Sequence, residues 1–181
     1  PKRRNRKRLD SKIHKMLASE LCLPGSKLIL YPRLHMKSTW VKFRICQLIL
    51  IDPLVRIGLW SKTSKLAKKE LVSIRNFMAY PIIRELFPEI IPDPGKDFTH
   101  WVKCTDTELT VWRDPEGYQP QENQVEAWGA TSTITGNHYD YHFYDDIIDK
   151  NSVKTAEQIE KTMSWWREMQ NVKDLSAEET M

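Results

Sequence analysis

The stretch LILYPRLHMKSTW, residues 28–40, decides the fold of this 181-residue chain. Its apolar start predicts a first strand over residues 27–30, and Lys37 is predicted to open a helix that runs to Leu50. A strand, a loop that ends in Lys-Ser/Thr and a helix form the layout of a phosphate-binding loop. Backbone N–H groups and the dipole at a helix start favour phosphate, lysine adds a mobile positive charge, and the next hydroxyl can ligate magnesium.

The loop departs from the standard pattern in its glycines. The usual spacing places glycine at positions 31 and 36, where this chain has Tyr31 and Met36. Residues other than glycine have fewer backbone conformations available and leave less room for a phosphate. An ordinary strand–turn–helix with a solvated Lys37 therefore remains open as the alternative.

A second signal is the pair of adjacent acids Asp145 and Asp146, which follows the aromatic run Tyr141–Tyr144. The run is typical of a buried strand. In a nucleotide hydrolase, one acid at such a strand end holds magnesium and the other orients or deprotonates the attacking water. A solvated acidic turn is the alternative, but the distance from Lys37 fits two or three β-α units.

The remaining segments favour an α/β domain. Apolar spacing and turn residues predict further helices over residues 9–23 and 64–79 and a strand over 55–60. Residues 108–113 and 123–130 are predicted to form a hairpin or two adjacent short strands with an extended loop. Thr155 and Gln158 form a capping box that opens a last helix, whose expected apolar face is Ile159, Met163, Trp166 and Met169. Strands that alternate with helices indicate a parallel sheet with its site at the carboxyl ends of the strands.

From about residue 25 to about 170, the chain resembles the ATPase domain of the large terminase subunit of tailed phages. The blocks that carry the resemblance are the loop 32–39 and the segments 55–71, 84–92 and 128–152. The resemblance implies a P-loop NTPase fold of the ASCE type, with a mostly parallel sheet flanked by helices. We expect this domain to span residues 25–181, after a basic N-terminal segment and lead-in helix at 1–24.

The resemblance also implies roles for individual residues. ATP would be held by the loop Pro32, Arg33, Leu34, His35, Met36, Lys37, Ser38 and Thr39, with Lys37 on the β- and γ-phosphates. Ser38 and Asp145 would ligate Mg²⁺. Asp146 would be the catalytic carboxylate, and Arg33 would stabilise charge on the transferred phosphoryl group. Thr135 and Asn137 flank Gly136, so no arginine finger acting on a neighbouring subunit is assigned there.

The function implied by the resemblance is ATP hydrolysis coupled to translocation of double-stranded DNA into a procapsid. The implied partners are the phage portal protein and the small terminase subunit, the implied assembly is a homo-oligomeric ring, and the implied location is the host cytoplasm. The family continues with another strand and a nuclease domain of ribonuclease H type. We recognise neither before Met181 and expect a truncated chain whose sheet lacks that strand.

Composition restricts the partners. Residues 1–80 hold 19 Lys/Arg and 4 Asp/Glu, a net charge of +15, and residues 81–181 hold 9 and 20, a net charge of −11. This asymmetry favours a nucleic-acid-facing half, which includes the basic run 2–8. No apolar run approaches 20 residues, so no membrane span is predicted. The three cysteines, widely spaced, are typical of reduced thiols in an intracellular protein.

Three other functions remain open. His138, Asp140 and His142 alternate along the approach to the acidic pair and could form an iron or zinc site. A helicase-like DNA translocase shares the phosphate loop and the acidic pair. A nucleic-acid-binding module without ATP turnover is the third alternative.

Overall fold

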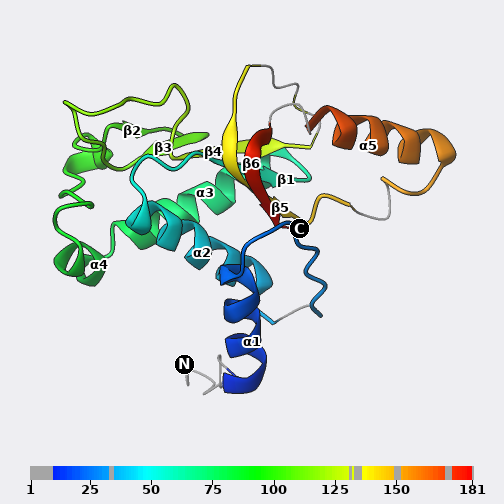
Figure 1. The fold of residues 1–181 in the computed structure, drawn as a ribbon, viewed down its shortest axis with the longest axis horizontal. Helices are drawn as coiled ribbons and strands as arrows, with labels where there is room; N and C mark the ends of the chain where they lie inside the picture. Colours follow the sequence, from blue (N-terminus) through cyan, green and yellow to red (C-terminus); the bar gives the residue numbers. More distant parts are fainter. Residues whose placement is uncertain are drawn as a thin grey trace, which may run out of the picture.

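The computed structural model shows an α/β fold in which helices flank one mixed six-stranded sheet (Figure 1). It describes residues 10–32, 35–130, 132, 136–148, 152–169 and 173–180. Arg33 and Leu34 of the expected phosphate loop lie outside these residues, as do the basic run 2–8 and Thr135. None of the described helices combines the length and the apolar character that crossing a membrane requires.

The sheet has a parallel part and an antiparallel part. Its strands are β1 (Ile57–Ser61), β2 (Lys103–Cys104), β3 (Glu108–Thr110), β4 (Val125–Gly129), β5 (Tyr139–Asp145) and β6 (Lys173–Thr180), in the spatial order β2-β3-β4-β1-β5-β6. Neighbours from β4 to β6 run parallel, whereas β2–β3 and β3–β4 are antiparallel. The antiparallel pair β3–β4 confirms the predicted hairpin, and the sheet as a whole is mixed.

The helices confirm the predicted apolar periodicity in most places. They are α1 (Ser11–Cys22), α2 (Lys37–Ile51), α3 (Ser64–Met78), α4 (Pro81–Leu86) and α5 (Ala156–Met169), with one 3₁₀ turn, η1 (Lys96–Phe98). The Asp10 carboxylate caps α1, and the Thr63 hydroxyl caps α3. The Thr155 hydroxyl accepts a hydrogen bond from the Gln158 N–H at 3.2 Å, as the capping-box prediction requires.

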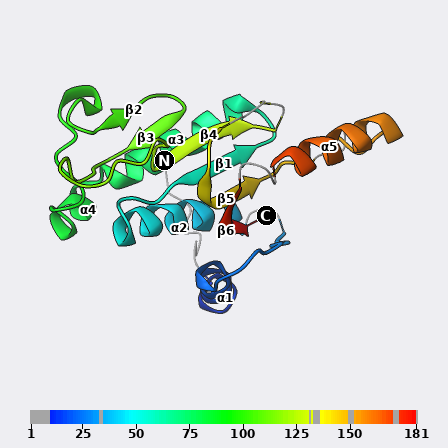
Figure 2. The ribbon, with the colours of Figure 1, turned by 45° about the horizontal axis from the view of Figure 1, so that its top comes forward.

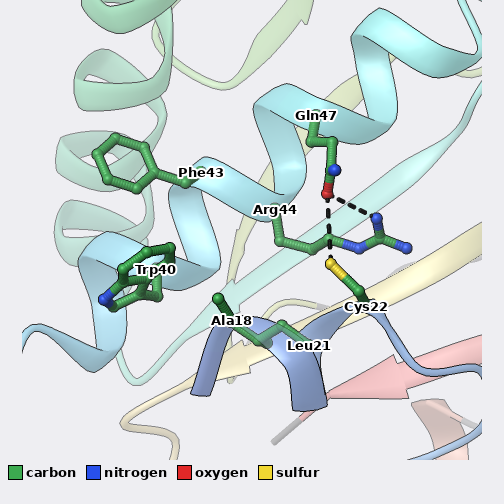
Figure 3. Close-up of a pocket in the computed structure, with 7 residues that line it drawn as sticks. All are labelled: Ala18, Leu21, Cys22, Trp40, Phe43, Arg44 and Gln47. Atoms are coloured by element: carbon green, nitrogen blue, oxygen red, sulfur yellow. Dashed lines mark hydrogen bonds between the residues drawn. The ribbon is translucent and has the colours of Figure 1, made fainter. Parts of the chain in front are cut away.

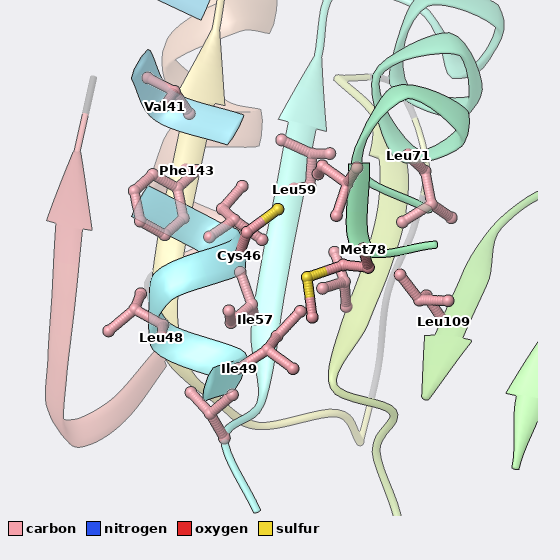
Figure 4. Packing of buried hydrophobic residues seen from close by; sticks show 14 of the residues in the cluster. Val41, Cys46, Leu48, Ile49, Ile57, Leu59, Leu71, Met78, Leu109 and Phe143 are labelled. Atoms are coloured by element: carbon pink, nitrogen blue, oxygen red, sulfur yellow. The ribbon is translucent and has the colours of Figure 1, made fainter. Parts of the chain in front are cut away.

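The main core lies between the sheet and the two helices α2 and α3 (Figure 4). Alternate side chains of a strand point to opposite faces, so Ile57 and Leu59 of β1 face these helices. They meet Ile45 on α2 and Ile74 on α3, and all four are at most 1% exposed. Burial of each such side chain stabilises the fold by roughly 1.5–3 kcal/mol. This packing holds α2 and α3 against the strands that end at the site.

A separate aromatic cluster occupies the other face of the sheet. It consists of Trp60, Tyr139, Tyr144, Trp165 and Met169, with Trp128 and Trp166 packed against it. Only the last turns of α5 take part, and the helix projects away from the sheet (Figure 2). Ile159 and Met163 are consequently 45% and 44% exposed, so the predicted apolar face of α5 is wrong at its amino-terminal half.

Two strand predictions are wrong. Residues 27–30 form no strand, only a single bridge at Lys27, although their side chains alternate between solvent at Leu28 and Leu30 and the core at Ile29. The sequence also predicts no strand after the last helix, whereas β6 pairs in parallel with β5 at the edge of the sheet. The acidic sequence of β6 has low intrinsic strand propensity, and pairing with β5 overrides that preference.

Candidate phosphate and cation site

The fold brings the lysine of the predicted loop to the predicted acidic pair. Lys37 Nζ lies 3.4 Å from Asp145 Oδ1 and 3.5 Å from Asp146 Oδ1. Lys37 begins α2, while Asp145 ends β5 and Asp146 follows it. We refer to these three residues as the acid–lysine cluster. Two motifs more than 100 residues apart therefore meet at one point, as the sequence predicted.

The cluster lies where parallel strands end. Ser61 ends β1 and is paired in register with Asp145 of β5 on one side and Gly129 of β4 on the other. A side chain on Gly129 would come within 2.6 Å of the Ser64 backbone nitrogen, so glycine permits α3 to start against the end of β4. Two helices of 15 residues, α2 and α3, thus begin at this edge. Their dipoles place positive potential beside the acids.

Met36 provides the conformation that the standard loop obtains from glycine. Its backbone is left-handed, with φ 59° and ψ 24°, and it directly precedes α2. Such a conformation costs a residue other than glycine roughly 1–2 kcal/mol. Asp146 is also left-handed, with φ 50°. Such backbone is common at functional sites, and among the described residues other than glycine it also occurs at Asp97 and Phe98.

The start of α2 has free capacity for an anion. Met36 makes no side-chain capping bond, and the first turn of the helix carries no acid of its own. The first N–H groups of any helix lack partners within the helix. Ser38 and Thr39 lie in this turn and are half-buried, as are His35 and Met36, whereas Pro32 is exposed. These residues lie at the start of α2 and in the loop that precedes it, and Arg33 and Leu34 are not described.

Asp145 has free capacity for a cation. The residue is 8% exposed, and its Oδ1 accepts no hydrogen bond within the described part of the chain. A buried carboxylate oxygen is costly unless it is paired, and here its neighbour is the Lys37 ammonium. Carboxylate oxygens are the ligands that magnesium prefers. The Asp146 side chain is 82% exposed and is open to water, as an acid that acts on a water molecule requires.

The sequence reasoning missed Ser61. Its side chain shares a sheet face with Asp145, because residues paired in register on parallel strands point the same way. It is 2% exposed and is the only hydroxyl residue of β1. The change from an apolar strand to a polar residue at its carboxyl end was a signal for a site residue, but the predicted strand stopped at Trp60.

Other buried acids are already satisfied. Glu126 accepts hydrogen bonds from the Tyr139 hydroxyl at 2.7 Å and from Asn137 Nδ2 at 2.8 Å. Burial, followed by the charge of Glu126, raises the pKa of Tyr139. Burial lowers the pKa of Arg113, which donates hydrogen bonds to two backbone carbonyls. These groups lie at the opposite end of the parallel strands and stabilise the fold there.

The alternative metal site is not assembled. Asp140 accepts hydrogen bonds from Arg56 Nε at 3.2 Å and from the Arg56 backbone N–H at 2.8 Å. His142 is fully buried, stacked on Trp60, and its Nδ1 lies 3.1 Å from the Tyr144 hydroxyl. Across the described ranges, no three His, Cys, Asp or Glu side chains are grouped to hold a metal ion.

A groove of about 290 Å³ lies between α1 and α2 (Figure 3). It is lined by Ala18, Leu21, Cys22, Trp40, Phe43, Arg44 and Gln47. Gln47 Oε1 accepts a hydrogen bond from Arg44 at 2.8 Å and a weak one from the Cys22 thiol at 3.6 Å. The polar side chains of the groove thus bond to one another, and the acid–lysine cluster remains the candidate site.

No model of a known protein family matches this chain, and no curated protein matches it either.

Proposed function

We propose that this chain is an ATPase domain that uses Mg²⁺–ATP to drive movement of double-stranded DNA, as in the large terminase subunit that packages phage DNA. One observation carries the proposal: Lys37 Nζ lies within 3.5 Å of both Asp145 and Asp146, at the start of α2. A lysine at a helix start facing two acids at a strand end is the arrangement that phosphoryl transfer to water needs.

In this proposal each residue has one task. Lys37 and the first N–H groups of α2 bind the β- and γ-phosphates. Asp145, together with the hydroxyl of Ser38, holds the magnesium ion, whose charge neutralises the phosphate oxygens when it is bound. Asp146, exposed beside them, orients the attacking water and accepts its proton.

The left-handed Met36 supports the same assignment. A phosphate-binding loop needs a residue with positive φ immediately before its lysine, and glycine normally supplies it. The chain reaches this conformation with methionine. At this one position the residue type departs from the standard loop, whereas φ has the sign that glycine would provide.

The test is steady-state ATP hydrolysis with Mg²⁺ by the wild type and by Lys37→Ala. We expect Lys37→Ala to lose turnover and to retain cooperative thermal unfolding. Lys12→Ala removes an equal charge from an exposed position of α1 and should hydrolyse ATP like the wild type. Unchanged turnover in a folded Lys37→Ala variant would refute the proposal.

A further inference from the structure

The solvent face of α3 carries charge of one sign. Its exposed polar residues include Lys65, Lys69, Ser73 and Asn76, spaced i, i+4, i+8 and i+11, and Leu66 is exposed beside them. They lie opposite the buried stripe Ala67, Leu71, Ile74 and Met78. No acid lies among them, so this face of the helix is a basic strip followed by neutral hydrogen-bonding groups. We call Lys65 and Lys69 the α3 lysine pair.

Nearby acids do not neutralise the α3 lysine pair. Glu70, the one acid of α3, is 2.7 Å from Lys42 of α2. Asp106 is 3.7 Å from Lys68, which neighbours Lys65 on the helix surface. Neither Lys65 nor Lys69 makes an ion pair with any residue that the structure describes. Both charges therefore remain available to a partner.

The position of these lysines is unfavourable for the helix alone. They occupy the first two turns of α3, where the helix dipole disfavours positive charge, and the first turn holds no acid. By contrast, α5 carries Glu157 in its first turn and Arg167 in its last. The exposed face of α5 also mixes signs, with Arg167 Nη1 3.1 Å from Glu160 Oε1. Of these two helices, α3 has the exposed face that suits an anion.

We propose that the α3 lysine pair binds the phosphate backbone of duplex DNA. Residues four apart on a helix have Cβ atoms about 5–6 Å apart, so two flexible lysines can reach successive phosphates of one strand. Lysine acts as a point charge and does not read base edges, so the contact is independent of DNA sequence. The choice of DNA as the polyanion rests on the proposed function and on the net charge of +15 in residues 1–80.

The surface lies close to the acid–lysine cluster along the chain. Ser61, paired in register with Asp145, is followed by Lys62 and by the Thr63 cap of α3. Lys65 is thus four residues from the strand end that adjoins the nucleotide site. DNA held on α3 would contact the same helix whose start packs against that edge of the sheet.

The experiment measures affinity of the full chain for a fluorescent 30-base-pair duplex, without nucleotide, from 50 to 200 mM KCl. Lys65→Gln/Lys69→Gln removes two charges, shortens each side chain by one atom and keeps a similar helix propensity. Log affinity falls as log salt rises, and each lost phosphate contact should make this slope less steep by about 0.9. The slope should therefore become less steep by about 1.8 in the double variant. The ratio of wild-type to variant affinity should then decrease about 12-fold between 50 and 200 mM KCl.

The matched control is Lys154→Gln/Lys161→Gln, which removes two exposed lysines in the acidic half of the chain. It should keep the wild-type slope. An unchanged slope in the Lys65/Lys69 variant overturns the inference, and so does an equal fall in both variants, which would reflect net charge alone. Binding of polyglutamate that is lost in the Lys65/Lys69 variant, with DNA affinity equal in variant and wild type, would assign the surface to an acidic protein instead. The DNA-binding assay contains no ATP, so its outcome does not depend on ATP turnover. A wild type that hydrolyses no ATP in the separate turnover assay would refute the proposed function without contradicting DNA binding by Lys65 and Lys69.

Discussion

The left-handed backbone of Met36 leads to a prediction about paired substitutions. We compare Met36→Gly with Met36→Ala, because both remove the same side chain and differ only in backbone freedom. The same two substitutions at Met16, an exposed residue inside α1, provide the control. If the Met36 backbone is in the left-handed region that glycine prefers, the glycine variant should be the more stable one at position 36 and the less stable one at position 16.

The magnitudes follow from the φ angles. At Met36, with φ 59°, alanine pays about 1–2 kcal/mol of steric strain that glycine avoids. Glycine loses about 0.5–1 kcal/mol more conformational freedom on folding. Glycine should therefore be the more stable variant at position 36 by about 0.5–1 kcal/mol. Inside α1 no strain offsets that loss, and glycine should be less stable than alanine by about 1 kcal/mol.

Thermal unfolding followed by circular dichroism measures both differences. For a domain of this size, 1 kcal/mol corresponds to about 2–4 °C in Tm. We expect Met36→Gly to melt about 1–4 °C above Met36→Ala, and Met16→Gly to melt about 2–4 °C below Met16→Ala. Equal or greater stability of Met36→Ala would show that position 36 is not held in the left-handed region, and would remove this support for a phosphate loop.

Two further predictions concern the acids and the cysteines. Asp145→Ala should lose Mg²⁺-dependent ATP binding, whereas Asp146→Asn should bind ATP and lose about 10²- to 10⁴-fold in turnover, because an amide cannot accept the proton. Titration with a fluorescent ATP analogue measures binding, and steady-state hydrolysis measures turnover. If both variants behave like the wild type, the acidic pair is only a surface turn. Burial raises the pKa of Cys46 to about 12, so at pH 8 it holds almost no thiolate, and iodoacetamide should label the exposed Cys22 and spare Cys46 in the folded chain. Peptide mass spectrometry reads this out, and equal labelling of both cysteines would contradict the packing around α2.

Elements with a strong local pattern could be predicted from the sequence. The helix that opens at Lys37 combines a loop ending in Lys-Ser-Thr with apolar residues on one face, and α2 begins at that lysine. The aromatic run before Asp145 predicted a strand that ends at the acidic pair, and β5 ends at Asp145. Both acids of the candidate site were found in this way, because sequence motif and strand end coincide there.

The features that escaped prediction depend on tertiary contacts. The sequence of β6 is acidic and forms a strand through its pairing with β5. Residues 27–30 have the composition of a strand, yet the structure gives them only a single bridge. Ser61 was missed because the predicted strand stopped at Trp60, and its register with Asp145 is visible only in the folded sheet. The left-handed Met36 escaped because the sequence rule expects glycine.

The aromatic cluster gives this chain a built-in optical probe of its candidate site. Trp60, Trp128, Trp165 and Trp166 make up four of its seven tryptophans, and all belong to or pack on that cluster. The Tyr144 ring contacts Trp60, Trp165 and Trp166, and Tyr144 is the residue directly before Asp145 in the chain. A change at the acid that alters the Tyr144 ring therefore alters the surroundings of the indoles. Their emission registers an event at the end of β5 without any added label.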